Sequence, residues 1–360
     1  MKKTLSLATA VLLFAFALSC GDDGNGNGPT PALGWEKVTV NAATPGVSTS
    51  LAMAGDGTAH IAFMDNSSRS LVVYATYKDN SLSVQSVGSS GYGQGRYATL
   101  AVDRSNKPHI AFYGGPPVFA LFYNNMSGSG FVTVDDDGHV GRWPSIQADA
   151  SRRPRISYYD STQGDLRYAR YDGSTWRVEV VDGTGDTGLN PSLALDGNGN
   201  PHVAYYDRTN GSLRYARRQQ GNWTFETVDN DGDVGKQPAL VLDNAGNANI
   251  LYNDVGKGRL KYATRAGGSW QVTPLSFAVA GDTGAALVLD SSGGLHVAFY
   301  DAGAVNFKYA HKSGGNWVTS VVASSYDGGG GCGLALGKDG KARVTYYDKA
   351  AGNVVYAYAK

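Results

Sequence analysis

The stretch PSLALDGNGNPHVAYYDRTNGSLRYARRQQGNWTFETV, residues 191–228, decides the fold. It holds four short segments rich in aromatic and β-branched residues, and GNGN, RTNG and QQG separate them. Segments of this composition, bounded by short turns of glycine, asparagine and polar residues, are typical of β-strands joined by hairpins. The stretch therefore predicts one antiparallel sheet of four strands.

The second segment of this stretch occurs seven times along the chain, at intervals of 46–49 residues. The seven copies are AHIAFMD (59–65), PHIAFYG (108–114), RPRISYYD (153–160), PHVAYYD (201–207), ANILYND (248–254), LHVAFYD (295–301) and ARVTYYD (342–348). A single four-stranded sheet cannot cover both of its own faces, but radially packed copies cover one another. Period and strand number together indicate the blades of a β-propeller.

The two ends of the repeat indicate a closed ring rather than an open solenoid. The last unit, which begins at Cys332, supplies three strands and then the chain stops. The missing piece is GWEKVTV (34–40), which carries Trp35 where the fourth strand of another unit carries Trp176. We therefore predict an all-β fold in residues 34–360, a seven-bladed β-propeller of four-stranded antiparallel blades, closed by the N-terminal strand completing the last blade.

The start of the chain predicts export and lipid anchoring. MKKTLSLATAVLLFAFALSC (1–20) has a basic start and an apolar run shorter than a membrane span, and its end resembles the lipobox of bacterial lipoproteins. We expect residues 1–19 to be a lipoprotein signal peptide and 20–33 to be a lipidated Cys20 followed by a flexible tether. The alternative is an ordinary secreted protein. Gly21 after the anchor favours the outer membrane of the cell envelope over other locations.

Charge and cysteine content narrow the class of partner. Removal of Lys2 and Lys3 leaves 29 basic against 31 acidic side chains, without a basic cluster, so a nucleic-acid partner is not expected. Cys332 is the one further cysteine, so no intramolecular disulfide stabilises the mature chain. We expect a monomer that binds a glycan or an envelope protein and contacts the membrane through its lipid anchor only.

Most repeated polar side chains have a structural interpretation. Histidine occupies the second position of the repeated segment in four units, but arginine or asparagine replaces it in the other three: His60, His109, His202 and His296 against Arg155, Asn249 and Arg343. We interpret these histidines as packed and hydrogen-bonded. Strand-end aspartates such as Asp160 and Asp207 are expected to accept turn N–H groups and to pair with Arg167 and Arg214.

Repeats of the form LALDGNGNPHVAYYDRTNGSLRYA (193–216) resemble the BNR-like repeats of exported bacterial propellers. With its Gly-x-Trp start to strand four, the blade plan is similar to that of fucose-binding propeller lectins and, more distantly, of sialidases. The sialidase resemblance is incomplete, because YDGSTW (171–176) has Asp172 one place too close for an Asp-box. Glu36, Glu179 and Glu226, the only glutamates, fall on fourth strands, away from any central pocket. The resemblance implies a propeller and leaves the function open.

Breaks in the repeat mark a candidate ligand site. The loops that join strand four to the next strand one, and strands two and three, open on the same face of a propeller. Around the second and third units these loops depart from the pattern, as in GGPPVF (114–119). The candidate ligand-binding residues are Tyr92, Arg96, Tyr97, Tyr113, His139, Arg142 and Trp143. Aromatic rings flanked by arginine and histidine suit binding of a sugar ring or a carboxylate. The alternative is that these loop sequences vary without any functional cause.

Two functional hypotheses follow from this cluster. The first is a lipid-anchored, non-enzymatic recognition module for glycans or a protein partner, because near-identical blades favour repeated shallow sites. The alternative is a polysaccharide lyase or glycoside hydrolase acting on an extracellular polysaccharide. In the lyase, His139 and either Tyr92 or Tyr113 exchange protons with the substrate, while Arg96 or Arg142 neutralises a uronate carboxylate. An inert envelope scaffold is a third hypothesis.

A metal site is a weaker expectation. Asp229, Asp231 and Asp233 in DNDGDVG have the alternating oxygen spacing of a calcium loop, but they lack the glutamate that an EF-hand loop requires. The competing interpretation is a solvated turn. We therefore expect no cofactor other than a structural calcium ion.

Overall fold

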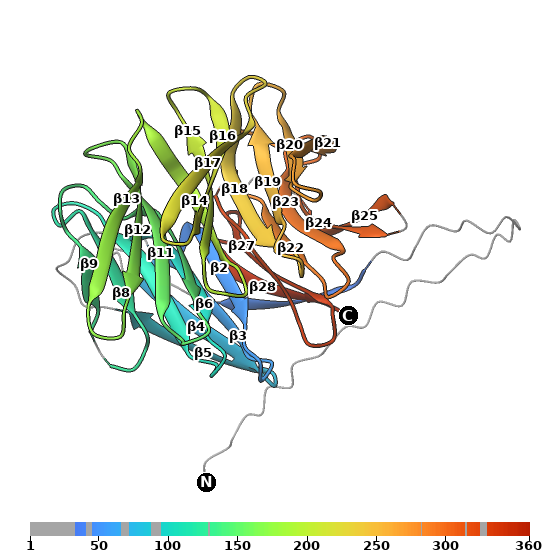
Figure 1. The fold of residues 1–360 in the computed structure, drawn as a ribbon. Coiled ribbons are helices and arrows are strands. Elements are labelled where there is room, and N and C mark those ends of the chain that lie inside the picture. Colours follow the sequence, from blue (N-terminus) through green and yellow to red (C-terminus); the bar gives the residue numbers. More distant parts are fainter. Residues whose placement is uncertain are drawn as a thin grey trace, which may run out of the picture. The chain divides into compact units, whose positions relative to one another are not determined.

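The computed structural model describes residues 33–40, 45–65, 72–87, 95–128, 130–281, 283–313, 315–324 and 330–360. These residues form 28 β-strands in seven sheets, each of four antiparallel strands (Figure 1). The predicted all-β, seven-bladed propeller is confirmed. Within the described ranges, no helix has the length and apolar character that a membrane crossing needs.

The blades follow the chain, and the strands of each blade are given from the centre of the ring outward. Blade 1 contains β2 (Pro45–Met53), β3 (Ala59–Asp65), β4 (Val72–Lys78) and β5 (Ser81–Val87). Blade 2 contains β6 (Gly95–Val102), β7 (Pro108–Gly114), β8 (Ala120–Asn124) and β9 (Val132–Asp135). Blade 3 contains β10 (Arg142–Ala148), β11 (Pro154–Asp160), β12 (Asp165–Tyr171) and β13 (Trp176–Asp182). Blade 4 contains β14 (Thr187–Leu195), β15 (Pro201–Asp207), β16 (Ser212–Gln219) and β17 (Asn222–Asp229).

The remaining three blades have the same plan. Blade 5 contains β18 (Val234–Leu242), β19 (Ala248–Asp254), β20 (Arg259–Thr264) and β21 (Gln271–Ala278). Blade 6 contains β22 (Ala286–Leu289), β23 (Leu295–Asp301), β24 (Asn306–Ser313) and β25 (Asn316–Ala323). Blade 7 contains β26 (Gly333–Leu336), β27 (Ala342–Asp348), β28 (Asn353–Ala359) and, from the other end of the described chain, β1 (Trp35–Val40).

The innermost strands form the inner wall of the ring. Each contacts the innermost strand of the next blade, in the order β2, β6, β10, β14, β18, β22, β26 and back to β2. Serine hydroxyls link several of these neighbours: Ser145 Oγ accepts the N–H of Leu193 at 3.0 Å, and Ser192 Oγ accepts that of Leu240 at 3.0 Å. A side chain on one blade thus satisfies a backbone donor on the next, which fixes the register between them.

Glycine allows the blades to approach closely at one repeated position. Gly188 has φ 90°, and a Cβ there would lie 2.5 Å from the Cα of Leu166 in the preceding blade. A side chain at this position would therefore push the two blades apart.

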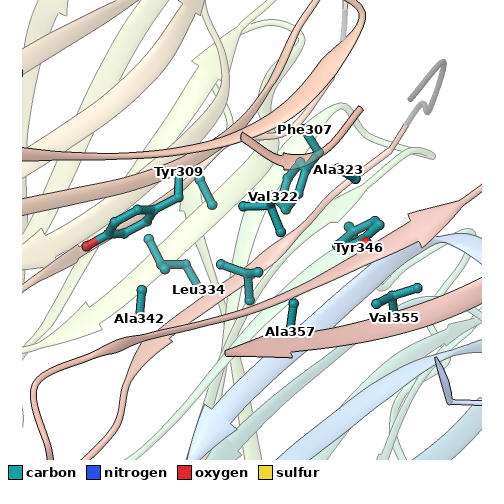
Figure 2. Packing of buried hydrophobic residues seen from close by; sticks show 11 residues of the cluster. Phe307, Tyr309, Val322, Ala323, Leu334, Ala342, Tyr346, Val355 and Ala357 are labelled. Atoms are coloured by element: carbon teal, nitrogen blue, oxygen red, sulfur yellow. The ribbon is translucent and has the colours of Figure 1, made fainter. Parts of the chain in front are cut away.

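β1 closes the ring by pairing antiparallel with β28, from Trp35 opposite Ala359 to Val40 opposite Val354. The Trp35 ring packs edge-on against Tyr309 of blade 6, with ring centroids 5.6 Å apart, and its Nε1 donates to Ser320 Oγ at 3.3 Å. Figure 2 shows the hydrophobic cluster that this seam contains, in which Phe307 and Val322 of blade 6 face residues of blade 7. The predicted closure is confirmed.

The fourth-strand tryptophans have a common place in the structure. Each of four packs edge-on against a third-strand tyrosine of the preceding blade, with centroid separations of 5.1–5.6 Å. The pairs are Trp35–Tyr309, Trp176–Tyr123, Trp223–Tyr168 and Trp270–Tyr215. The sequence repeat therefore encodes contacts between blades as well as strands within a blade.

Buried ion pairs occupy the other end of several seams. Lys261 Nζ lies 2.9 Å from Asp229 Oδ2 of blade 4 and 3.7 Å from Asp254 Oδ2, and Tyr252 donates its hydroxyl to Asp229 Oδ2 at 2.7 Å. Arg167 lies 2.7 Å from Asp160 and Arg214 lies 3.6 Å from Asp207, so the predicted pairing of strand-end aspartates is confirmed. The carboxylates and Lys261 are buried, the arginines are partly buried, and the opposite charges neutralise one another.

Replacement of Trp35 by alanine tests the closure. We expect Trp35→Ala to lower the free energy of unfolding by about 2 kcal/mol, because a partly buried aromatic contact between blades is lost. Chemical denaturation of the purified protein measures this change, with Val321→Ala as a control at an exposed position of β25. Equal stability of the two variants would contradict a closing role for Trp35.

Replacement of Lys261 tests the buried ion pair. Lys261→Met should destabilise the fold by about 3 kcal/mol, since Asp229 then remains buried without its cation. The double variant Lys261→Met with Asp229→Asn should lose less stability than Lys261→Met alone, because no uncompensated charge is left. Lys257→Met, which removes an exposed lysine from the turn before β20, should leave the denaturation midpoint nearly unchanged. The account is wrong if the double variant is less stable than Lys261→Met.

Candidate functional site

Each of several innermost strands bulges near the axis of the ring. β14 begins at Thr187, four residues before the segment that the sequence suggests, and its register shifts between Leu189 and Ser192. Asn190 lies in this shift with φ 50°, a left-handed conformation that non-glycine residues rarely adopt. Equivalent residues in three other blades have the same conformation: Tyr97 (φ 55°), Trp143 (φ 49°) and Gln237 (φ 51°).

These bulges surround a pocket at the axis. The pocket has a volume of about 240 Å³, and every blade contributes to its lining. The lining residues at the bulge position are Ser48, Tyr97, Trp143, Asn190, Gln237, Gly284 and Gly331. Cys332 also lines the pocket, and burial raises the pKa of its thiol to about 12, so the thiol is protonated at neutral pH.

Four of the sequence-predicted ligand residues lie together, and two of them, Tyr97 and Trp143, line the axial pocket. The Tyr97 ring lies 6.5 Å from that of Tyr113 and 5.4 Å from that of Trp143. The guanidinium of Arg142 lies 4.6 Å above the Trp143 ring. The structure therefore brings Tyr97, Tyr113, Arg142 and Trp143 into one aromatic cluster.

The other predicted residues are placed differently. His139 is exposed, and its ring stacks on that of Phe119 with centroids 3.9 Å apart. Its backbone N–H donates to Thr162 Oγ1 at 2.7 Å. Cys20 and Tyr92 lie outside the described residues, as does the side chain of Arg96. The pairing of His139 with Tyr92 in the lyase hypothesis stays a prediction.

The three aspartates of the proposed calcium loop point to different partners. Asp229 binds Lys261 at 2.9 Å, Asp231 binds Lys257 at 2.9 Å, and Asp233 accepts the hydroxyl of Tyr206 at 2.7 Å. In the described part of the chain, no three histidine, cysteine, aspartate or glutamate side chains gather closely enough to hold a metal ion. This arrangement gives the calcium prediction no support.

A larger pocket, which the sequence did not reveal, lies in the seam between blades 2 and 3. It has a volume of about 650 Å³ and lies where the turns joining the first to the second strands meet those joining the third to the fourth. This is the end of the blades opposite to the predicted loops. We call it the seam pocket.

Aromatic side chains form one wall of the seam pocket. The half-buried Trp176 contacts Tyr123 of blade 2 edge-on, with centroids 5.2 Å apart, and lies 5.5 Å from the ring of Tyr171. The exposed Val132 and the buried Pro154 extend the wall. The result is an apolar surface that one face of a small ring can cover.

Polar groups lie beside this wall. His109 is buried, its Nδ1 lies 2.7 Å from the hydroxyl of Tyr123, and its Nε2 lies 3.5 Å from Asp103 Oδ2. Burial lowers the pKa of His109, an effect that nearby Asp103 opposes only in part, so the imidazole is neutral at pH 7. Burial alone would raise the pKa of Asp103, but hydrogen bonds from Lys107 and Ser105 outweigh burial and lower it. The carboxylate is therefore ionised.

The outer rim of the seam pocket is cationic. Lys107, Arg152 and Arg153 are exposed side chains that line it. Among the described residues, none of the three has a carboxylate oxygen within 4.0 Å. Three rim cations face the single carboxylate of Asp103.

Equivalent but smaller pockets occur at three other seams, between blades 3 and 4, 4 and 5, and 7 and 1, with volumes of about 290, 400 and 320 Å³. Their cations are largely paired with carboxylates. Arg218 lies 2.9 Å from Glu179, Arg265 lies 2.8 Å from Glu226, and Lys78 lies 2.9 Å from Asp56.

The interpretation of the repeated histidines is confirmed but incomplete. His60, His109, His202 and His296 each bond a third-strand tyrosine through Nδ1, as packed structural residues do. His109 also lines the seam pocket, and His202 lines the smaller pocket between blades 4 and 5. A signal was present in the sequence: the turn before the second strand reads SRRP (151–154) in blade 3, where blade 4 has NGNP (198–201).

Comparisons with known proteins agree with this geometry at the level of the fold. No family model matches the chain, and no curated protein matches its sequence. Solved propellers do resemble it. A variant of the Aleuria aurantia lectin in complex with α-methyl-L-fucoside superposes with a TM-score of 0.51 at 15% identity, covering 80% of this chain and 98% of the lectin. The SapL1 lectin in complex with α-methyl fucoside superposes with a TM-score of 0.54 at 12% identity, covering 79% of this chain and 98% of the lectin.

An enzyme shares the fold as well. The polysaccharide lyase Uly1 superposes with a TM-score of 0.55 at 10% identity, covering 89% of this chain and 91% of the lyase. Identities this low establish a common fold and nothing about ligands. The BNR-like resemblance remains an expectation.

The environment of His109 predicts how stability depends on pH. The pKa of His109 in the folded state lies below its unfolded value of 6.5, so the unfolded chain binds the proton more readily. Stability is therefore full above pH 6.5 and falls as the pH drops below that value. In His109→Gln, the free energy of unfolding measured from pH 7 to pH 5 should decline less steeply than in the unchanged protein. Parallel curves would contradict the proposed burial of a neutral imidazole.

Proposed function

We propose that this chain is a carbohydrate-recognition module whose principal sugar site is the seam pocket between blades 2 and 3. The observation that carries the proposal is the wall of Trp176, Tyr171 and Tyr123 beside ionised and hydrogen-bonding groups. A pyranose has an apolar C–H face and a polar edge, so it matches a site with an aromatic face and a polar rim. The pocket volume of about 650 Å³ accommodates one or two sugar rings.

Two further observations support this proposal. Lectins that bind α-methyl fucoside share the fold, so the fold is compatible with sugar binding at similar size. The pockets at other seams offer additional weak sites on the same side of the ring. Several weak sites on one chain increase the avidity for a polymer that repeats the same sugar.

The amino-terminal sequence completes the proposal. A signal peptide followed by a lipidated Cys20 and a tether would hold the propeller at the cell envelope, by our expectation at the outer membrane, with the module monomeric. An outward-facing module anchored in this way would meet extracellular polysaccharide directly. An envelope protein is the alternative partner.

An enzymatic role is the second candidate, favoured by the cluster of side chains that reaches the axial pocket through Tyr97 and Trp143. Tyr97 and Tyr113 lie beside Arg142 and Trp143, which is the combination of a hydroxyl, a cation and an aromatic surface that a lyase acting on uronates uses. This candidate also needs His139 as the base. It predicts ultraviolet-absorbing unsaturated products that disappear in His139→Ala.

Substitution of Trp176 tests the recognition role. Trp176→Ala should abolish or weaken sugar binding by at least about tenfold, because the apolar face of the site is lost. The matched control is Trp223→Ala, which removes the same edge-on contact at the next seam, where the pocket lining does not include the tryptophan. A glycan array identifies ligands, and calorimetry on the selected glycan compares the variants.

Each result of this experiment has a definite meaning. Binding that Trp176→Ala removes and Trp223→Ala retains supports the module. Equal loss in both variants contradicts a site at the seam pocket. Release of unsaturated product by the unchanged protein during the same incubations supports the enzyme instead.

A further inference from the structure

We infer that the seam pocket selects acidic sugars, with the carboxylate of a uronate-type pyranose bound by Lys107, Arg152 and Arg153 while the ring lies against Trp176. This inference rests on the proposed function and names its ligand class. The observation that supports it is a turn of blade 3 whose residues differ from those of the equivalent turns in other blades.

The turn between the first and second strands has the same backbone in all seven blades, so the blades serve as controls for one another. Its fourth residue adopts a left-handed conformation and donates its N–H to the carbonyl of the first residue. Five blades have glycine there: Gly57, Gly199, Gly246, Gly293 and Gly340, with φ between 71° and 89°. Blade 2 has Asn106 and blade 3 has Arg152, both with φ 64°.

Arginine is an unfavourable residue for that position. A left-handed conformation costs little for glycine and more for a residue with a Cβ, and asparagine tolerates it better than arginine does. Backbone strain of this kind tends to persist where a site needs the side chain. Arg152 lines the seam pocket, so the strained turn places a cation at its rim.

The fifth residue of the turn is also replaced by a cation in blades 2 and 3. Asn200 and Asn247 occupy it in blades 4 and 5, and each donates its side-chain amide to the first aspartate of its own turn. Arg153 replaces them in blade 3, and Lys107 does so in blade 2. The Arg153 guanidinium lies over Gly173, since a Cβ at Gly173 would be 3.2 Å from Nη2. The guanidinium is thus packed against the turn that leads into Trp176.

Charge balance separates this pocket from the others. At the seam between blades 4 and 5, Glu226 binds Arg265 and lies 4.0 Å from Arg217. The carboxylate of the seam pocket, Asp103, instead accepts three hydrogen bonds from its own turn, two from Ser105 and one from the Lys107 N–H. The side chains of Lys107, Arg152 and Arg153 therefore retain their capacity to bind an anion.

A carboxylate is the anion that this site suits. Two guanidinium groups on consecutive residues offer planar, paired donors, which match the two oxygens of a carboxylate. The aromatic wall holds the ring that bears the carboxylate. Ammonium and guanidinium groups at an exposed rim attract an acidic polymer in a manner that salt weakens.

Grafting the turn of blade 4 onto blade 3 tests the inference. Arg152→Gly with Arg153→Asn removes both cations and also relieves the left-handed turn, so the variant should fold with an equal or higher Tm. The matched control is Lys312→Gln with Lys341→Gln, which removes two exposed charges that line none of these pockets. Calorimetry compares trisaccharides of galacturonate and glucuronate with their methyl esters, and α-methyl fucoside is the neutral reference.

We expect the unchanged protein and the control to bind at least one uronate about tenfold more tightly than its methyl ester, and the grafted variant to lose that difference. Equal binding of acid and ester, or tight binding of the fucoside alone, overturns the acidic preference while the proposed function stands. If the grafted variant still binds the acid more tightly than the ester, the acidic preference is also overturned. Absence of binding to every saccharide overturns the proposed function together with this inference.

Discussion

Each blade buries apolar side chains on both of its faces, and this requirement for two covered faces constrains the rest of the molecule. On β15, Val203 and Tyr205 pack against blade 3, whereas Ala204 packs against blade 5. A blade without a neighbour would expose one of these faces, so the row of blades must return to its start. The pairing of β1 with β28 completes that return, and Trp35 carries the aromatic contact of the other blades into the closing seam.

The seams produced by this packing also explain where the proposed sugar site lies. Tyrosine, tryptophan and histidine rings pack in the seams, and pockets lie beside them where the turns of two blades meet. Most of these pockets have internally paired charges, which stabilise the turns and present little to a ligand. Between blades 2 and 3 the same scaffold has an arginine pair in place of glycine and asparagine. The two arginines of this one loop make the seam a candidate recognition site.

The repeat in the sequence was sufficient to predict the strands, the number of blades and the closing strand, because each depends on local hydrophobic pattern and on counting. The clustering of Tyr97, Tyr113, Arg142 and Trp143 was also predictable, since neighbouring loops of one face converge. The bulge at Asn190 was not, because a left-handed residue within a strand leaves no signature in the hydrophobic pattern. The seam pocket was missed because its lining combines turns of two blades, and only a comparison of equivalent turn residues singles out Arg152.

A crystal structure of this protein with a bound uronate trisaccharide tests the account most directly. The account predicts electron density for a sugar ring stacked on Trp176 between blades 2 and 3, with its carboxylate within hydrogen-bond distance of Arg152 or Arg153. Density for the sugar beside Trp143 at the axial pocket, with the seam pocket free of sugar, would contradict it.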